Sequence, residues 1–382
     1  MAAQHPIALY IHWPFCVSKC PYCDFNSHVR ETIDQAQWRT ALLADLAHEA
    51  SLTRGRTLGS IFFGGGTPSL MDPATVAALI DAAAAHWPVA NGIEITMEAN
   101  PNSAEAARFT DVAAAGVNRL SLGLQALDDA ALRFLGRAHD VREGLAALDA
   151  AQRAVDRVSL DLIYARPDQS AADWQAELAQ ALSFGTEHLS LYQLTIEPGT
   201  RFETDVRLGA MTPADPDHAA TLYELTQAMT AAAGRPAYEV SNHAAPGAES
   251  RHNLAYWRYA DYAGVGPGAH GRRGPLATTR HRKPENWLAA LARNGHGLQE
   301  ERPLGPEERA GEALMMGLRL AEGIDLADIA ARTDVSQDRL VDDEAVARLA
   351  AHGLIVHAGN RLTVTPQGML LLDGILGEIV AV

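Results

Sequence analysis

The sequence CVSKCPYC, residues 16–23, holds all three cysteines of this 382-residue chain. Three thiols within such a short stretch cannot form a framework of paired disulfides, so a bound metal explains the clustering better. The stretch follows an apolar run at residues 7–11 that predicts a β-strand. In parallel α/β folds, ligand sites are built from the loops that follow the strands. We therefore expect a metal site at the carboxyl end of the first strand.

The first half of the chain alternates short apolar runs with longer amphipathic stretches. This spacing is typical of parallel βαβ units, and either a doubly wound sheet or a barrel, complete or incomplete, fits the connections. The predicted strands are Ile7–Ile11, Ser60–Phe63, Glu94–Met97, Arg119–Leu122, Val158–Ile163 and His188–Leu191. The predicted helices include Asp34–Ala50, Pro73–His86, Ala104–Ala115 and Ala171–Phe184.

The alternation changes after residue 205, and a separate block begins at residue 306. A helix-like run, Pro216–Ala233, leads into a region rich in glycine, histidine and aromatic residues, Tyr238–Gly274. In the last block, helical patterns precede two short strands joined by a turn, which predicts a small α+β domain of the winged-helix type. Those helices are Glu307–Leu320, Leu326–Arg332 and Asp343–Ala351, and those strands are Leu354–His357 and Arg361–Thr365. We expect three segments, 1–205, 206–305 and 306–382.

The charge balance speaks against a general nucleic-acid binder. The chain carries 31 Lys+Arg against 47 Asp+Glu, a formal net charge of −16, whereas a nucleic-acid footprint is basic. The last block is also acidic, so a scaffold role is favoured over DNA reading there. The chain has no apolar stretch long enough for a membrane span and no signal-peptide pattern at its N-terminus. These features predict a cytoplasmic protein.

Glycines and polar residues at later strand ends indicate a ligand site near the cysteines. Residues 62–68, FFGGGTP, follow the second strand, and their glycines allow the backbone to approach a ligand closely. Glu98, Gln125 and Asp161 close or follow the next strands. One such polar residue is usually a helix cap or a loop contact. Several of them beside one cysteine loop predict a shared site.

Two metal sites are compatible with the cysteine spacing. Three thiolates can bind three irons of a [4Fe–4S] cube and leave the fourth iron open to a small molecule. Alternatively, His12 or His28 completes a Cys3His zinc site. The glycine stretch and the polar strand ends favour the cube.

The motif Cys16-x3-Cys20-x2-Cys23, with Tyr22 before its last cysteine, resembles the signature of the radical S-adenosylmethionine (radical SAM) superfamily. The resemblance implies a partial (β/α)6 TIM-like barrel over residues 1–205. It also implies a [4Fe–4S] cluster held by the three cysteines, with S-adenosylmethionine on the open iron.

Four further stretches are similar to one branch of that superfamily. They are residues 10–16 (YIHWPFC), 64–68 (GGGTP), 121–125 (SLGLQ) and 161–164 (DLIY). The branch contains oxygen-independent coproporphyrinogen III dehydrogenases (HemN) and haem chaperones of the HemW type. The resemblance implies S-adenosylmethionine contacts at Tyr10, Tyr22, Gly65, Gly66, Thr67, Glu98, Gln125, Arg137 and Asp161. Carboxylates suit the ribose hydroxyls, and Arg137 suits the methionine carboxylate.

Three features resemble the HemW type more than the dehydrogenases. Phe25 stands where the dehydrogenases carry a further cysteine, and only 15 residues precede Cys16. Residues 251–257, RHNLAYW, resemble a His-Asn-x-x-Tyr-Trp motif that implies haem binding. Imidazole is a normal axial ligand of haem iron, and aromatic rings stack on the macrocycle. The haem-binding candidates are His252, Asn253, Tyr256 and Trp257.

Alternatives remain for the haem contacts. His252 is either an iron ligand or a structural histidine hydrogen-bonded through Asn253, and His243 and His270 compete for the ligand role. The basic side chains between residues 272 and 283 are either partners for haem propionates or a solvated face. They are Arg272, Arg273, Arg280, Arg282 and Lys283.

The resemblance predicts a haem chaperone that binds a [4Fe–4S] cluster, S-adenosylmethionine and haem. Its partners would be haem-acceptor proteins, including membrane-associated ones, although this chain has no membrane segment of its own. Whether it turns over S-adenosylmethionine as an enzyme stays open, and no catalytic residue is predicted. The alternatives are an oxidative decarboxylase of coproporphyrinogen III and a zinc-stabilised interaction protein.

Overall fold

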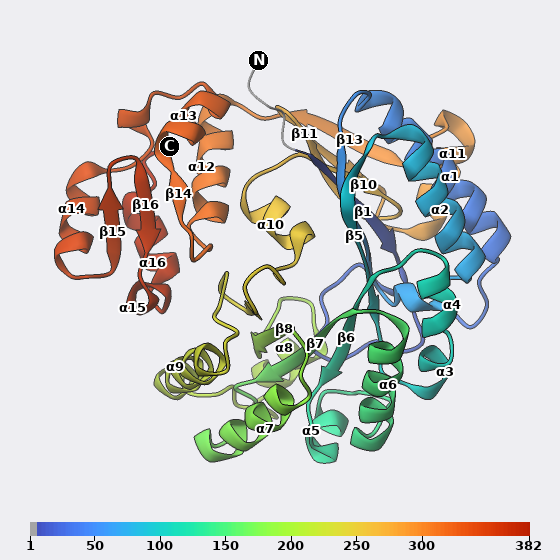
Figure 1. Ribbon diagram of the computed structural model, residues 1–382, viewed down its shortest axis with the longest axis horizontal. Helices are drawn as coiled ribbons and strands as arrows, with labels where there is room; N and C mark the ends of the chain where they lie inside the picture. Colours follow the sequence, from blue (N-terminus) through green and yellow to red (C-terminus); the bar gives the residue numbers. More distant parts are fainter. Residues whose placement is uncertain (1–5) are drawn as a thin grey trace.

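The computed structural model describes residues 6–382 and is built around one sheet of 11 strands. The strands lie in the order β13-β12-β11-β10-β1-β4-β5-β6-β7-β8-β9. Every neighbouring pair from β10 to β8 is parallel, and the pairs at both ends are antiparallel. Figure 1 shows the helices of the first half covering the outer face of this sheet. The sheet has two free edges and is therefore a barrel that does not close.

All six predicted strands of the first half are confirmed. They are β1 (Ile7–Trp13), β4 (Leu58–Gly65), β5 (Val89–Ala99), β6 (Arg119–Gln125), β7 (Arg157–Tyr164) and β8 (His188–Gln193). The helices that return the chain between them include α1 (Gln35–Leu52), α2 (Pro73–His86), α4 (Phe109–Ala114), α6 (Val141–Ala154) and α7 (Ala171–Ser183). Strands β1 and β6 are buried on nearly every residue, as expected when helices cover one face and a filled interior the other.

One predicted helix is divided. The run Ala104–Ala115 forms α3 (Ser103–Ala106) and α4, because the chain turns between them and Arg108 donates a hydrogen bond to the carbonyl oxygen of Met71 at 2.6 Å. The run Pro216–Ala233 is confirmed as α9 (Pro216–Ala232).

The region after α9 extends the sheet, which the sequence patterns did not predict. Strand β9 pairs with β8, while β10 pairs with the free side of β1 and is followed by three antiparallel strands. The new elements are β9 (Asn242–Ala244), α10 (Arg251–Trp257), β10 (Tyr262–Val265), β11 (His270–Arg273), β12 (Leu276–Arg280), α11 (Pro284–Asn294) and β13 (Leu298–Pro303). Helix α10 lies between the sheet and the C-terminal region (Figure 1).

The C-terminal region is a small α+β unit with its own apolar core. Three short strands form a sheet in the order β14-β16-β15, as expected for a hairpin joined by an additional strand. The elements are α12 (Pro306–Gly317), β14 (Ile324–Asp325), α13 (Leu326–Thr333), α14 (Asp343–Ala351), β15 (Ile355–Ala358), β16 (Arg361–Val364), α15 (Pro366–Met369) and α16 (Leu372–Ile379).

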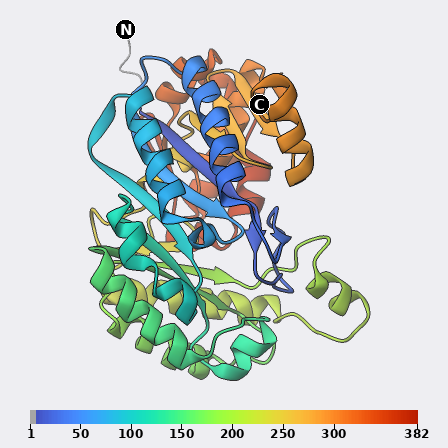
Figure 2. The ribbon, with the colours of Figure 1, turned by 90° about the vertical axis from the view of Figure 1, so that its right-hand side faces the viewer.

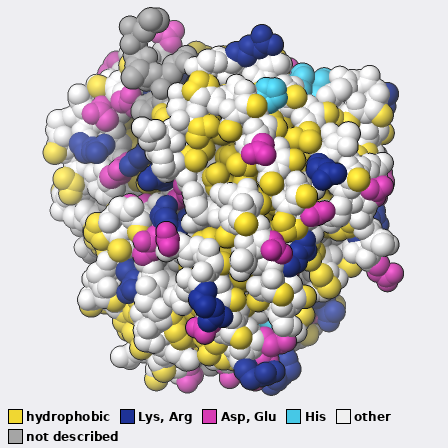
Figure 3. Space-filling view, turned by 45° about the vertical axis from the view of Figure 1, so that its right-hand side comes forward, with side chains coloured by type: hydrophobic (Ala, Val, Ile, Leu, Met, Phe, Trp, Pro, Cys, Tyr) yellow, Lys and Arg dark blue, Asp and Glu magenta, His cyan; other side chains and the backbone are white. Residues whose placement is uncertain are grey.

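The surface carries charges of both signs. Figure 3 shows Lys and Arg side chains interspersed with Asp and Glu over one face of the molecule. Within residues 6–382, no helix combines the length and the apolar composition that a membrane span requires.

Candidate functional site

The three cysteines lie on a loop at the carboxyl end of β1. The loop is framed by two short parallel strands, β2 (Phe15–Cys16) and β3 (His28–Val29). Its far side is held by α8 (Arg201–Arg207), where the Phe202 N–H donates to the Pro21 carbonyl oxygen at 3.0 Å. Figure 2 shows this loop, in blue, beside the yellow-green segment that contains α8. All three thiols are partly buried, so the loop presents them to a sheltered space.

The first two cysteines of the motif accept hydrogen bonds from residues that follow β4 and α5 (Asp129–Phe134). The Thr67 hydroxyl donates to Cys16 Sγ at 3.5 Å, and Arg137 Nη1 donates to Cys20 Sγ at 3.4 Å. Burial raises the pKa values of the Cys16 and Cys23 thiols, and their mutual repulsion with Cys20 as thiolates adds to the effect. A bound metal ion would reverse this rise, because metals bind thiolates.

The donor set fits an iron–sulfur cube. Among residues 6–382, no three His, Cys, Asp or Glu side chains form a ligand group for a metal ion. A zinc ion needs ligands that meet at one point, whereas a cube binds each thiolate through a different iron. His12 has no spare nitrogen for zinc, since its Nδ1 lies 3.0 Å from the Tyr10 hydroxyl and its Nε2 lies 2.9 Å from the Asn26 carbonyl oxygen.

The glycine stretch brings bare backbone against the cysteine loop. Gly65 has a φ of +113°, which disfavours any side chain, and an added Cβ would lie 2.6 Å from His12. A Cβ on Gly66 would lie 2.6 Å from the Phe15 carbonyl oxygen. Only glycine fits either position. The Gly65 N–H donates to Glu98 Oε2 at 3.1 Å.

Two carboxyls, Glu98 on β5 and Asp161 on β7, face the barrel interior from the strands on either side of β6. Burial, followed by repulsion from Asp161, raises the pKa of Glu98 to about 8. Burial also raises the pKa of Asp161 to about 6, although hydrogen bonds from Ser190 and Ser121 oppose the rise. A carboxyl that is protonated near neutral pH can both donate to and accept from a hydroxyl, which suits a ribose.

Arg137 joins the carboxyl end of β6 to the cysteine loop. Its Nη2 donates to Asn100 Oδ1 at 2.5 Å and to the Gly123 carbonyl oxygen at 3.1 Å. Burial alone would lower the pKa of Arg137, but Tyr22 and Cys20 together raise it, so the guanidinium stays charged.

Three of the predicted S-adenosylmethionine contacts, Gly65, Glu98 and Gln125, lie at the carboxyl ends of β4, β5 and β6, whereas Tyr22 lies on the cysteine loop and Arg137 follows α5. Hydrogen bonds join Gly65 to Glu98 and Arg137 to Asn100. Gln125 ends β6 with a φ of +69°. Asn100 was not predicted, although it bridges Thr67 and Arg137 by donating to Thr67 Oγ1 at 2.9 Å. Its position two residues after Glu98, beyond the end of the same strand, could have indicated it.

Known proteins are similar to this sequence. The chain matches the family described as the radical SAM superfamily over residues 10–180, and the HemN C-terminal domain over residues 304–371. It is 38% identical over 387 residues to the heme chaperone HemW of Escherichia coli, a match that covers 98% of each chain. The chain belongs to the radical SAM superfamily, in its HemN/HemW branch.

Other relatives in this superfamily are mitochondrial. Radical S-adenosyl methionine domain-containing protein 1 of Bos taurus is 44% identical over 328 residues, which cover 83% of this chain and 74% of that protein. The solved structure of the radical SAM enzyme coproporphyrinogen III oxidase (HemN) from Escherichia coli has a TM-score of 0.83 at 22% identity. That likeness covers 98% of this chain and 90% of HemN, and it confirms the predicted fold class of a partial barrel with a small C-terminal α+β region.

In this radical SAM chain, the four haem-binding candidates on α10 face different surroundings. His252 is only 4% exposed, stacks on Phe62 with ring centroids 4.8 Å apart, and places Nδ1 3.2 Å from the Ser60 hydroxyl. Burial lowers its pKa to about 3, so the imidazole is neutral. Asn253 Nδ2 donates to the Tyr238 hydroxyl at 3.4 Å.

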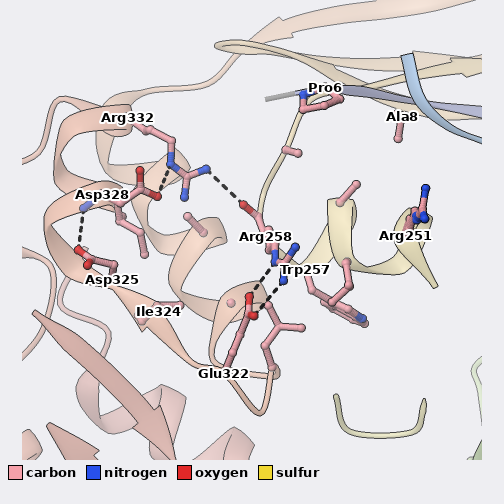
Figure 4. A pocket seen from close by; sticks show the side chains of 18 of the residues that line it. Pro6, Ala8, Arg251, Trp257, Arg258, Glu322, Ile324, Asp325, Asp328 and Arg332 are labelled. Carbon is pink, nitrogen blue, oxygen red and sulfur yellow. Dashed lines mark hydrogen bonds and ion pairs between the residues drawn. The ribbon is translucent and has the colours of Figure 1, made fainter. Parts of the chain in front are cut away.

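The two aromatic residues at the end of α10 line separate cavities. Trp257 faces a cavity of about 510 Å³, which we call the base cavity, between the first residues of β1 and the C-terminal helices α12 and α13. Figure 4 shows its rim, where Arg258 pairs with Glu322 at 2.7 Å and Arg332 pairs with Asp328 at 2.9 Å. Tyr256 lines a cavity of about 440 Å³ on another side of α10. The four motif residues thus do not converge on one surface.

The two carboxyls of the barrel interior predict a pH dependence of stability. Because their pKa values are raised in the folded state, folding favours their protonated forms, and this contribution is complete below about pH 4. It is lost as the pH rises through about 6 for Asp161 and about 8 for Glu98. We expect the melting temperature of the ligand-free protein to decrease as the pH rises from about 4 to about 8. Glu98→Gln should flatten the fall and add on the order of 1–2 kcal/mol at pH 8.

Thermal melts at several pH values test this expectation. Glu31→Gln, which changes an exposed carboxyl, serves as the control and should follow the unchanged protein. If Glu98→Gln also follows it at every pH, Glu98 does not carry the effect.

Proposed function

We propose that this protein is a haem chaperone that binds haem, carries a [4Fe–4S] cluster with S-adenosylmethionine, and passes haem to acceptor proteins. The observation that carries the proposal is the near full-length similarity to the heme chaperone HemW of Escherichia coli. Heme chaperone HemW of Bacillus subtilis supports it at 32% identity over 97% of that protein. The motif helix α10, which borders two cavities, supports it as well.

Cys16, Cys20 and Cys23 would hold the cluster. A cluster bound there supplies one-electron chemistry to S-adenosylmethionine, while the protein provides position and shelter. Arg137, already beside Cys20, would pair with the methionine carboxylate. The bare backbone of Gly65 and Gly66 would accept the methionine amine.

The remaining predicted contacts would hold the nucleoside. Glu98 on β5 and Asp161 on β7 lie close enough to interact and would hydrogen-bond the ribose hydroxyls, with Tyr10 packed nearby. Gln125, Thr67 and Tyr22 complete the set. The assignment of each residue to a part of S-adenosylmethionine belongs to the proposal.

Haem titration tests the proposal. The full chain is reconstituted with iron and sulfide without oxygen, and ferric haem is then added while the Soret band is recorded. We expect saturable binding at about one haem per chain and transfer of that haem to an apo-haemoprotein added afterwards. A titration that never saturates would show that the protein is not a haem chaperone.

The same preparation distinguishes the rival activity. Coproporphyrinogen III is supplied with S-adenosylmethionine and a low-potential reductant, and protoporphyrinogen is measured. We expect none. Product formation with repeated turnover would instead identify an oxidative decarboxylase, the activity suggested by the fold shared with HemN.

A further inference from the structure

Asn100 joins two side chains that donate to the cysteine sulfurs. Its Oδ1 accepts from Arg137 Nη2 at 2.5 Å, and its Nδ2 donates to Thr67 Oγ1 at 2.9 Å. The Thr67 hydroxyl in turn donates to Cys16 Sγ at 3.5 Å, and Arg137 Nη1 donates to Cys20 Sγ at 3.4 Å. A single amide therefore stands behind a donor to each of the first two cysteines.

The chemistry of its neighbours fixes which way the Asn100 amide points. A guanidinium has donors and no acceptor, so the amide atom that faces Arg137 is the oxygen. The amide nitrogen then faces Thr67 and donates to the hydroxyl oxygen. A hydroxyl has only one proton of its own, and with Asn100 as a donor this proton is left for Cys16 Sγ. Asn100 thus sets the direction of the Thr67 hydroxyl.

The oxygen of the same amide helps to orient the Arg137 guanidinium. Both protons of Nη2 are used, one by Asn100 Oδ1 and the other by the Gly123 carbonyl oxygen at 3.1 Å. Two acceptors on one nitrogen hold the plane of the guanidinium, because its donors form a rigid fork. Nη1 is the nitrogen that this arrangement leaves facing Cys20.

Asn100 is itself held in place by the segment that follows β5. Pro101 restricts the backbone of the preceding residue to extended conformations. The Asn100 N–H donates to Glu105 Oε2 at 2.9 Å, and Glu105 is only 2% exposed. Ser69 donates to the same carboxylate from the segment after β4. The amide is therefore anchored before any ligand binds.

Hydrogen bonds to cysteine sulfurs change the reduction potential of an iron–sulfur cube. The reduced cube carries one more negative charge than the oxidised cube, and part of that charge lies on the sulfurs. A donor aimed at a sulfur therefore stabilises the reduced state more than the oxidised state. The direction of the Thr67 and Arg137 donors thus affects how easily the cube accepts an electron.

We propose that Asn100 is a positioning residue that raises the reduction potential of the cluster, by directing the Thr67 hydroxyl to Cys16 Sγ and Arg137 to Cys20 Sγ. This inference rests on the cluster of the proposed function and adds a residue that tunes it. Asn100 acts through its two neighbours.

Redox titration of Asn100→Asp tests the inference. Aspartate has nearly the same shape but no donor for Thr67, so the Thr67 hydroxyl turns to the new carboxylate and leaves Cys16. The reconstituted full chain is titrated without S-adenosylmethionine, and the reduced cluster is measured by electron paramagnetic resonance. At the potential where half of the unchanged protein is reduced, we expect the reduced-to-oxidised ratio to fall about tenfold, a shift of about 59 mV for one electron.

Two further variants separate the hydrogen bond from the added charge. Ser103→Asp adds the same charge at an exposed position of α3, where solvent screens it, and should change the ratio by less than about twofold. Thr67→Val removes the hydroxyl that Asn100 directs. In this background we expect Asn100→Asp to lower the ratio by only about threefold or less. An equal effect of Asn100→Asp with and without the Thr67 hydroxyl would show a pure charge effect and overturn the inference.

The outcomes distinguish this inference from the proposed function. If the unchanged protein assembles no cluster, the proposed function fails. If it does, and Asn100→Asp has the same potential, this inference alone fails. Should folded Asn100→Asp hold no cluster, Asn100→Ala replaces it, because it loses both contacts without adding charge, and the same tenfold fall is expected. Loss of the cluster in both Asn100 variants, while Thr67→Val retains it, would show that Asn100 is needed for assembly and would contradict the tuning role.

Discussion

Cys20→Ser is expected to leave the anaerobically reconstituted protein with almost no bound iron or sulfide. Cys20 is the central thiol of the motif and accepts a hydrogen bond from Arg137. A hydroxyl is a poor substitute for a thiolate, and two remaining cysteines cannot hold a cube that already lacks one protein ligand. We expect iron and sulfide contents, and the cluster absorbance, to fall by at least about tenfold.

Ser18→Ala is the control for this experiment, because it changes an exposed residue of the same loop and keeps all three thiols. It should retain the cluster. Metal analysis of the unchanged protein must accompany both variants. One zinc ion per chain, without iron or sulfide, would contradict the cluster and support the zinc-stabilised alternative.

Arg280→Met is expected to destabilise the barrel by about 3–5 kcal/mol, because it leaves buried carboxylates without their partner. Arg280 is fully buried on β12, and it donates to Asp45 Oδ2 at 2.6 Å and to Glu49 Oε1 at 2.8 Å. Both carboxylates lie on α1 and are also fully buried. The pairs thus fasten the sheet extension to the first helix of the barrel.

Urea unfolding followed by tryptophan fluorescence measures this effect, since Trp38 on α1 and Trp287 on α11 stack with centroids 5.3 Å apart beside the ion pairs. The double variant Arg280→Met/Glu49→Met is the matched comparison. Removing both partners should recover part of the loss. Equal stability of Arg280→Met and the unchanged protein would show that these ion pairs do not stabilise the fold.

The parallel strands could be predicted because their apolar runs are buried on both faces. Residues 119–122, for example, are apolar or small at most positions and lie wholly within β6. The prediction failed for β10 to β13, where the alternation is interrupted by glycine, histidine and arginine. Strand β13, with the sequence LQEERP, has no buried residue, so its polar sequence carries no strand signal of its own. Its place is fixed by pairing with β12.

The sequence patterns also gave wrong predictions for two basic residues of β11 and β12. Their sequence spacing suggested either propionate contacts or a solvated face, and for Arg280 and Arg273 both interpretations are wrong. Arg280 is buried with two acids of α1, and Arg273 pairs with Glu49 and Glu301. The two acids of α1 lie more than 200 residues away in sequence from Arg280, so no local pattern could reveal that pairing.

For the candidate site, the position of polar residues at strand ends indicated Glu98, Gln125 and Asp161, whereas Tyr22 and Arg137 came from the family resemblance. Glu98 and Asp161 lie on different strands but influence each other's proton, as a shared edge requires. That pattern could not indicate Tyr192, which follows Ser190 on β8 and whose pKa is raised by burial and by Asp161. Nor could it show that the motif on α10 divides its side chains among separate compartments, because a helix of seven residues turns its successive positions to different sides.

Because the motif residues of α10 face separate compartments, this helix connects a surface cavity to the barrel interior. The rings of Tyr256, His252 and Tyr10 follow one another at centroid distances of 5.1 and 6.1 Å, from the 440 Å³ cavity that Tyr256 lines to the neighbourhood of Glu98. Ligands at the two ends would contact one row of packed rings, and we expect their binding to be coupled. Such coupling is reciprocal. If the first ligand changes the affinity for the second by some factor, the second changes the affinity for the first by the same factor.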